Sequence, residues 1–279
     1  MEFVYLLVMI LSLKQSQVSS SDSKQFQLRE VLLDPKQVDH DKGRIISDAC
    51  LPMRPPPHPR DCSELQSSCP GQSLVSGEYT IQPDHYPSPF LVYCDFDSEG
   101  EAWTVIQRRM DGSVNFQRNW HDYREGFGFL KTEFWLGNEK LSFLTAQNYY
   151  ELRIELHNQL HEPYYAAYNS FRVGDESMKY RLILGSHYTG NATNSLRLHN
   201  MHFFTTFDAD HDVKPDRNCA SETSHGGGWW FHQCDECNLN GAYGVQSDFN
   251  PGGIEWNNLP GGGWGLTRTE MKIRRVVSS

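Results

Sequence analysis

The sequence predicts an α+β fold, because a stretch rich in strand patterns is followed by a long stretch rich in loop residues. Between Tyr150 and His157 apolar and polar residues alternate, which is the pattern of a strand with one buried face. From about residue 205 to residue 263, Gly, Asn, Asp and Trp dominate and regular patterns are scarce. We therefore expect a sheet followed by a loop-rich region that carries the function.

Further strands are expected on either side of this one, and two short segments between strands have the pattern of helices. The strands are expected at 78–82, 90–96, 103–108, 171–173, 180–184 and 264–275. The helices are expected at 120–125 and 139–147.

The N-terminus has the features of a signal peptide. The apolar run Phe3–Leu13 is too short for a membrane span, which needs roughly 20 residues, but it fits the apolar segment of a signal peptide, about 7–15 residues. Small residues at Val18 and Ser20 predict cleavage before Ser21, so residues 1–20 are expected to be removed. Glu2 stands where a basic residue is usual, and a short membrane anchor is the alternative.

Residues 21–60 are expected to be a flexible, proline-rich arm. The segment Leu51–Arg60 reads LPMRPPPHPR, which favours extended polyproline geometry and acts as a spacer. The few apolar residues before it are far short of the heptads that a coiled coil requires. The globular domain is expected to span residues 61–277.

The composition limits the possible partners. Hydrophobic residues make up 38% of the chain and aromatic residues 13%, enough for a core, and the formal net charge is −10. A nucleic-acid partner requires clustered Lys and Arg, so this acidic excess argues against one. No other segment is apolar enough to insert into a membrane, and Asn191 begins the N-glycosylation sequence Asn-Ala-Thr. We expect a secreted, extracellular glycoprotein.

Catalytic patterns are absent from the sequence. His157 and His161 are four residues apart, but Asn158 stands where a zinc protease has its glutamate. There is no G-x-S-x-G nucleophile elbow, and the glycine run 261–265 is not followed by the Lys of a phosphate-binding loop. The chain is therefore not expected to be an enzyme.

Nine strings of residues stand out between about residues 61 and 277. They are Val92–Asp95, Trp103–Arg109, Asp111–Trp120, Gly126–Gly128, Glu133–Asn138, Trp229–Trp230, Asn238–Gly241, Ile254–Trp256 and Met271–Arg274. In this order they resemble the fibrinogen C-terminal domain family, which includes fibrinogen-like proteins, angiopoietin-like proteins and ficolins. The resemblance implies a small N-terminal subdomain, a central twisted antiparallel sheet with short helices, and a loop-rich C-terminal subdomain with a calcium site beside a ligand pocket.

The resemblance implies two disulfides, Cys62–Cys94 and Cys219–Cys234. The chain has seven cysteines, so at least one is free or pairs with another chain. Cys237 is expected to pair with Cys69 or Cys50, and Cys50 is the preferred partner for an interchain bond. Residues 234–237 also form a C-x-x-C sequence, and the alternatives of a zinc site with Cys219 and His232 or of a redox pair are less favoured.

The resemblance also implies a calcium loop. Asp210 and Asp212 would contribute side-chain oxygens, and the backbone carbonyls of Lys214 and Asp216 would complete the shell. The loop is one residue longer than in the family before Asn218 and contains a proline, and a solvated acidic turn is the alternative.

The ligand pocket implied by the family departs from its pattern at one position. Asp235 stands where relatives that bind acetyl groups or peptides have a His, and an ionised carboxylate cannot donate a hydrogen bond. The analogy also allows a cis peptide bond at Gln233–Cys234, which costs about 2.5–4 kcal/mol for a non-proline residue. The expected pocket residues are Trp230, Phe231, Asp235, Tyr243 and Phe249.

Three functions follow from these patterns. The first is a secreted ligand of a cell-surface receptor with a calcium-stabilised binding subdomain. The second is a ficolin-like lectin that binds glycans or acetylated groups, and the third is a matrix or clot-associated module. Because the arm offers no coiled coil, the chain is expected to be a monomer or a disulfide-linked oligomer.

Overall fold

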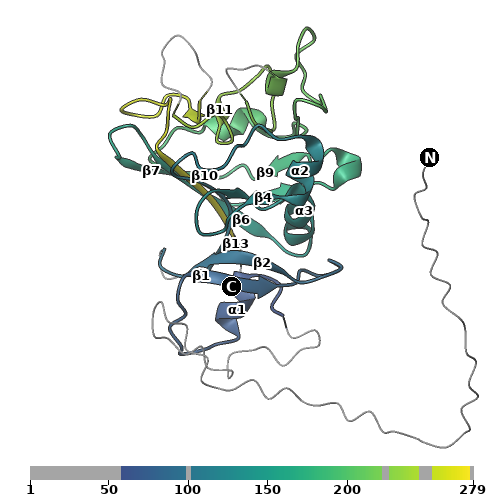
Figure 1. The fold of residues 1–279 in the computed structure, drawn as a ribbon. Coiled ribbons are helices and arrows are strands. Elements are labelled where there is room, and N and C mark those ends of the chain that lie inside the picture. The colour runs from purple at the N-terminus through teal and green to yellow at the C-terminus, as the bar shows by residue number, and fades with distance from the viewer. Residues whose placement is uncertain (1–57, 99–101, 222–225, 245–252, 277–279) are drawn as a thin grey trace, which may run out of the picture. The chain divides into compact units, whose positions relative to one another are not determined.

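An antiparallel sheet of nine strands forms the centre of the domain in the computed structural model, which describes residues 58–98, 102–221, 226–244 and 253–276 (Figure 1). The strands lie in the order β1-β2-β3-β13-β6-β7-β10, with β5 paired to β3 and to β4. Their bounds are β1 (Gly77–Ile81), β2 (Phe90–Asp95), β3 (Trp103–Arg109), β4 (Phe127–Gly128), β5 (Phe134–Trp135), β6 (Tyr150–His157), β7 (Pro163–Tyr168), β10 (Tyr188–Gly190) and β13 (Arg268–Arg275).

Short helices and two small strand pairs complete the described fold. The pairs are β8 (Phe171–Val173) with β9 (Leu182–Leu184) and β11 (Cys237–Asn238) with β12 (Glu255–Trp256). The helices are α1 (Cys62–Ser67), α2 (Trp120–Glu125) and α3 (Asn138–Ala146), and the 3-10 turns are η2 (Glu176–Met178), η3 (Ser195–His199) and η4 (Cys219–Ser221).

The α+β class predicted from the sequence is confirmed. In β6, the side chains of Tyr150, Leu152, Ile154 and Leu156 are buried and the intervening ones are half-buried, as the alternation predicted. The strand expected at 264–275 begins only at Arg268, because Trp264 instead bridges to Glu255 of β12. The predicted signal peptide, residues 1–20, and most of the arm, residues 21–60, lie outside the described residues. No helix in the described ranges is long and apolar enough to cross a bilayer.

The two ends of the domain meet at a buried carboxylate. Asp61 caps α1 by accepting a hydrogen bond from the backbone N–H of Glu64 (2.7 Å). The same side chain accepts hydrogen bonds from Arg275 at the end of β13 (2.7 Å) and from the hydroxyl of Tyr150. The disulfide Cys62–Cys94 then joins α1 to β2. This contact therefore fixes the start of the domain to its last strand.

The last strand also carries a buried ion-pair network in the middle of the sheet. Lys272 on β13 is fully buried, and its ammonium lies 2.8 Å from carboxylates of both Asp95 and Glu155. Burial alone would lower the pKa of Lys272, but its hydrogen bonds to Asp95 and Glu155 outweigh burial and the net shift is upward. The network ties β13 to β2 and β6.

Removing the Lys272 ammonium is expected to destabilise the domain strongly. In Lys272→Met the carboxylates of Asp95 and Glu155 would lose their cation, and breaking a buried ion pair on one side costs about 3–5 kcal/mol. Urea unfolding measures this loss in the free energy of unfolding. The exposed Lys131→Met is the matched control and should change it by no more than about 0.5 kcal/mol. Equal effects of the two substitutions would contradict a stabilising role for the network.

Candidate functional site

A pocket of about 290 Å³ lies where the loops after β10 return toward the sheet. We call it the acid pocket. It is lined by Lys214, Gln233, Cys234, Asp235, Glu255, Asn257 and Trp264. Of the residues expected to form a ligand pocket, it therefore contains Asp235.

The disulfide Cys219–Cys234 holds one wall of the acid pocket. Its Cα atoms are 5.4 Å apart, and it joins η4 to the segment before β11. The peptide bond Gln233–Cys234 is cis, as the analogy allowed. Both expected disulfides are thus present, and one of them contributes a residue to the pocket surface.

Two carboxylates face each other in this pocket, and we call Asp235 and Glu255 the acid pair. Glu255 begins β12, is 2% exposed, and shares a hydrogen bond with Asp235. Burial, the negative charge of Asp235, that hydrogen bond and the charge of Glu236 together raise the pKa of Glu255 to about 9. At neutral pH the acid pair therefore holds a proton.

A buried histidine shapes the backbone beside the acid pair. His199, at the end of η3, accepts hydrogen bonds at Nε2 from the backbone N–H groups of Glu236 (3.1 Å) and Cys237 (3.3 Å). Its proton must then lie on Nδ1, which donates to the carbonyl of Trp230 (2.8 Å). Burial lowers the pKa of His199, so the neutral ring is favoured. His199 positions the segment that carries Asp235.

A second set of hydrogen bonds fixes the opposite wall. The backbone N–H of Asn257 donates to the carbonyl of Glu236 (2.9 Å), and its side chain donates to the Glu236 carboxylate (2.9 Å). The carbonyl of Asn257 accepts hydrogen bonds from the hydroxyls of Thr193 (2.5 Å) and Ser195 (2.9 Å). The acid pocket therefore has a rigid rim on both sides of the acid pair.

Three of the expected pocket residues do not line the acid pocket. Trp230 and Phe231 are fully buried, and the Trp230 indole packs against Trp135 and donates to the carbonyl of Tyr180 (2.7 Å). These two side chains belong to the aromatic core, and expecting them in the pocket was wrong. Tyr243 lines a different cavity. Phe249 lies outside the described residues.

Cys237, two residues after Asp235, is a buried thiol. Cys237 is not bonded to Cys69; the two lie in different subdomains, one in β11 and the other just after α1 (Figure 1). Of the two partners expected for Cys237, Cys69 is therefore not bonded to it, and Cys50 lies outside the described residues. Burial, followed by the charges of Asp235 and Glu255, raises the pKa of Cys237, which disfavours the thiolate that redox chemistry requires. The disulfide Cys219–Cys234 likewise removes two ligands of the zinc alternative.

The expected calcium loop brings two carboxylates close to each other. Asp210 accepts a hydrogen bond from the N–H of Asp212 (3.2 Å), and Asp212 accepts from the N–H groups of Lys214 (2.8 Å) and Cys219 (2.8 Å). Burial, and to a smaller extent the nearby charge of Asp210, raise the pKa of Asp212. These hard oxygen donors fit a calcium ion, whose charge would reverse the shift. Within the described ranges, no three acidic, His or Cys side chains form a metal-binding group.

The predicted glycosylation site has a geometry that suits the modification. Asn191 is exposed beyond the edge strand β10, and its side-chain oxygen accepts a hydrogen bond from the N–H of Tyr165 (2.7 Å). This contact uses the side-chain oxygen and not the amide nitrogen, the atom to which a glycan would be attached. Glycosylation of Asn191 stays a prediction.

Comparisons with known proteins agree with this architecture. The family model described as "Fibrinogen beta and gamma chains, C-terminal globular domain" matches residues 58–276. "Fibrinogen-like protein A" of Apostichopus parvimensis is 49% identical over 220 residues, covering 78% of this chain and 76% of that protein. "Fibrinogen C domain-containing protein 1" of Xenopus tropicalis is 44% identical over 223 residues, and the match spans 77% of this chain but only 47% of that protein.

Solved structures show the same fold. The fibrinogen-like globe domain of human ANGPTL2 has a TM-score of 0.71 and 41% identity, covering 78% of this chain and 99% of that one. A lamprey fibrin D-dimer complexed with the peptide Gly-His-Arg-Pro-amide has a TM-score of 0.69 and 37% identity, covering 79% of this chain and 75% of that one. The chain therefore belongs to the fibrinogen C-terminal domain family.

Proposed function

We propose that the chain is a secreted, non-enzymatic recognition protein whose acid pocket binds a cationic group of a partner at the cell surface. The observation that carries this proposal is the acid pair, the buried carboxylate of Glu255 facing the half-buried Asp235 in a pocket with a rigid rim. Among the residues that line the pocket, no hydroxyl or free thiol accompanies the pair as a nucleophile, because the sulfur of Cys234 is bonded to Cys219. The pocket is suited to holding a ligand without transforming it.

The charge balance of the acid pocket favours a cation. At neutral pH one proton bridges two carboxylates, and Glu236 behind them adds further negative charge. An ammonium or guanidinium group could replace that proton, ionise both carboxylates and gain charge-assisted hydrogen bonds. Lys214 at the edge reduces the excess negative charge without abolishing it.

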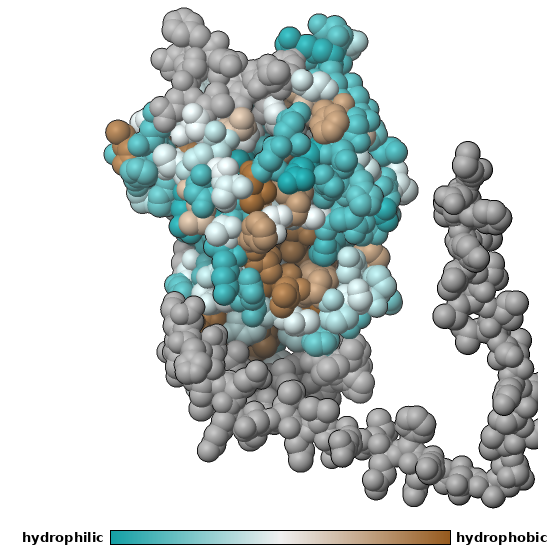
Figure 2. Space-filling view, in the orientation of Figure 1, coloured by the Kyte–Doolittle hydropathy of each residue, from teal (hydrophilic) through white to brown (hydrophobic). Residues whose placement is uncertain are grey.

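A protein or peptide partner is supported by two further observations. The lamprey relative is in complex with a peptide that carries a basic side chain. The surface view shows an apolar area in the middle of one face, surrounded by hydrophilic residues (Figure 2). Apolar areas of this kind mark contact sites with other proteins.

The second candidate function is a lectin that binds acetylated groups in the same pocket. An acetyl carbonyl needs a hydrogen-bond donor. The proton on the acid pair is a donor, but it is already engaged in the hydrogen bond between Glu255 and Asp235. The cationic ligand is therefore preferred over the acetyl group, and a matrix or clot-associated role ranks third.

Calcium is part of the proposal as a stabiliser of the neighbouring loop. Asp210 and Asp212 would hold the ion through side chains, and Lys214 and Asp216 through backbone carbonyls. A bound calcium ion supplies positive charge next to two carboxylates. Lys214 belongs both to this loop and to the acid pocket, so ordering the loop would also order the pocket.

The acid pair predicts a distinct dependence of stability on pH. Because folding raises the pKa of Glu255 from 4.5 to about 9, its protonation stabilises the fold below pH 4.5 and this contribution is lost as pH rises toward 9. Glu255→Gln removes the titration. Its thermal stability should therefore fall less than that of the wild type between pH 5 and pH 9, and parallel curves would contradict the raised pKa.

Small probes test the preference for a cation. Butylammonium is expected to shift the amide NMR signals of residues 233–235, whereas N-butylacetamide, its uncharged acetylated counterpart, should not. Asp235→Asn should weaken butylammonium binding at least tenfold. The exposed Asp97→Asn, which changes the net charge equally, should not weaken it. Preferential binding of N-butylacetamide would favour the lectin candidate instead.

The calcium site is tested by thermal melting with calcium and with magnesium as control. Calcium should raise the melting temperature of the wild type, and Asp212→Asn should abolish the increase. Asp216→Asn should keep it, because that residue would bind through its carbonyl. A calcium effect that survives Asp212→Asn, or none in the wild type, would refute this site.

A further inference from the structure

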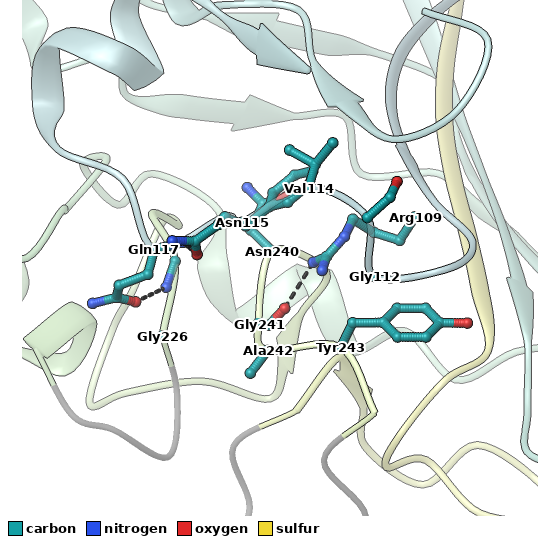
Figure 3. A pocket seen from close by; sticks show the side chains of 13 residues that line it. Arg109, Gly112, Val114, Asn115, Gln117, Gly226, Asn240, Gly241, Ala242 and Tyr243 are labelled. Carbon is teal, nitrogen blue, oxygen red and sulfur yellow. Dashed lines mark hydrogen bonds between the residues drawn. The ribbon is translucent and has the colours of Figure 1, made fainter. Parts of the chain in front are cut away.

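A second cavity, of about 380 Å³, shares no lining residue with the acid pocket. Figure 3 shows this cavity from close by. We call it the amide cavity, because uncharged polar groups dominate its walls. Its volume is in the range of small-ligand sites, about 300–1,000 Å³. It is lined by Arg109, Gly112, Ser113, Val114, Asn115, Phe116, Gln117, Gly226, Gly227, Asn240, Gly241, Ala242 and Tyr243.

One wall of the amide cavity is held by a buried carboxylate. Glu133 is fully buried, and its Oε1 accepts hydrogen bonds from the backbone N–H groups of Met110 (2.8 Å), Asp111 (3.1 Å) and Gly112 (2.9 Å). Its Oε2 accepts a fourth from Val114 (3.1 Å). Charge-assisted hydrogen bonds are stronger than neutral ones, so this loop is ordered without a ligand.

The opposite wall is held by the last residue of β3, the strand that leads into this loop. Arg109 at the end of β3 is 1% exposed, and it donates to the carbonyl of Gly241 at 2.7 Å, as Figure 3 shows. Gln117 accepts a hydrogen bond from the N–H of Gly227 (2.6 Å) and so joins the two walls. The shape of the cavity is therefore set before any ligand arrives.

An aromatic ring closes one end of the cavity. The hydroxyl of Tyr243 donates to either of two acceptors, the carbonyls of Met110 (2.9 Å) and Thr267 (3.0 Å). Its ring packs on Gly112, where an added Cβ would come within 2.8 Å of the ring. Gly112 also has φ of +71°, so both the backbone and the contact require glycine.

The chemistry of the lining groups points to an uncharged ligand. The charged residue among them, Arg109, lies 3.6 Å from the Glu133 carboxylate, which offsets its charge. Asn115 uses its side-chain oxygen to accept from the N–H of Gln117 (2.8 Å), which leaves its NH₂ group to donate to a ligand. Ser113 adds a hydroxyl, and the half-buried Tyr243 adds an aromatic surface.

We propose that the amide cavity binds a neutral sugar ring, as a site separate from the acid pocket. The hydroxyls of a sugar both donate and accept hydrogen bonds, which suits Ser113, Asn115 and the backbone groups of this wall. The less polar face of the ring would lie on Tyr243. This site does not depend on the function proposed for the acid pocket.

Saturation-transfer NMR on the full chain, with glucose, galactose, mannose and cellobiose as probes, tests the proposal. At least one probe should bind the wild type. Ala242→Trp, a substitution at the exposed rim, should reduce its affinity at least tenfold by filling the cavity. Asn115→Asp should also weaken probe binding. The substitution keeps the side-chain oxygen that accepts from the N–H of Gln117 but removes the NH₂ group that would donate to the sugar.

Two controls separate this site from the others. Ala146→Trp, at the exposed end of α3, should bind the probe like the wild type. Asp235→Asn, in the acid pocket, should also bind it normally, even if the acid pocket proves to have another function. The proposal is overturned if no probe binds the wild type, or if Ala242→Trp binds the probe as tightly as the wild type does.

Discussion

The rest of the structure depends on the position of the last strand. β13 lies between β3 and β6 in the middle of the sheet, so the chain must return to the centre of the domain after its long loop-rich segment. That segment is consequently held at both ends, by the β7–β10 pair where it begins and by β13 where it finishes. Within its described parts, the segment is also held by the disulfide Cys219–Cys234 and by the hydrogen bonds of Glu236 to His199 and Asn257.

Both cavities are lined in part by residues of this loop-rich segment, but the polar groups that line them differ. In the acid pocket, the disulfide Cys219–Cys234 and the neutral His199 position a pair of carboxylates. In the amide cavity, the charged side chains of Glu133 and Arg109 form hydrogen bonds with backbone groups, so the groups that face the cavity are mostly neutral. The loop-rich region thus lines an acidic site and, together with the segment that follows β3, an uncharged site.

Much of the fold could be predicted because its strands carry strong local patterns. The alternation of β6 gave its bounds closely, whereas β7 begins with Pro163 and reads PYYAAY, which has no alternation to detect. Helix α1 is only six residues long, and its main signal is the capping Asp61, a cue too weak to distinguish it from a turn.

The sites were harder to predict because burial and proximity decide them. Trp230 and Phe231 lie next to the disulfide in sequence, yet their side chains point into the core. Glu255 gave a usable signal, a charged residue between Ile254 and Trp256 in an apolar strand, but its partner Asp235 lies 20 residues away and only the fold brings them together. His199 lies in a segment with no motif.

Carboxyl carbon-13 NMR of the glutamate side chains, recorded as a pH titration of the wild type and of Glu255→Gln, tests the central claim most directly. The account predicts one glutamate that titrates near pH 9 in the wild type and is missing from the variant. If every glutamate titrates near its ordinary value of about 4.3, the raised pKa of Glu255 is contradicted, and with it the account of the pocket.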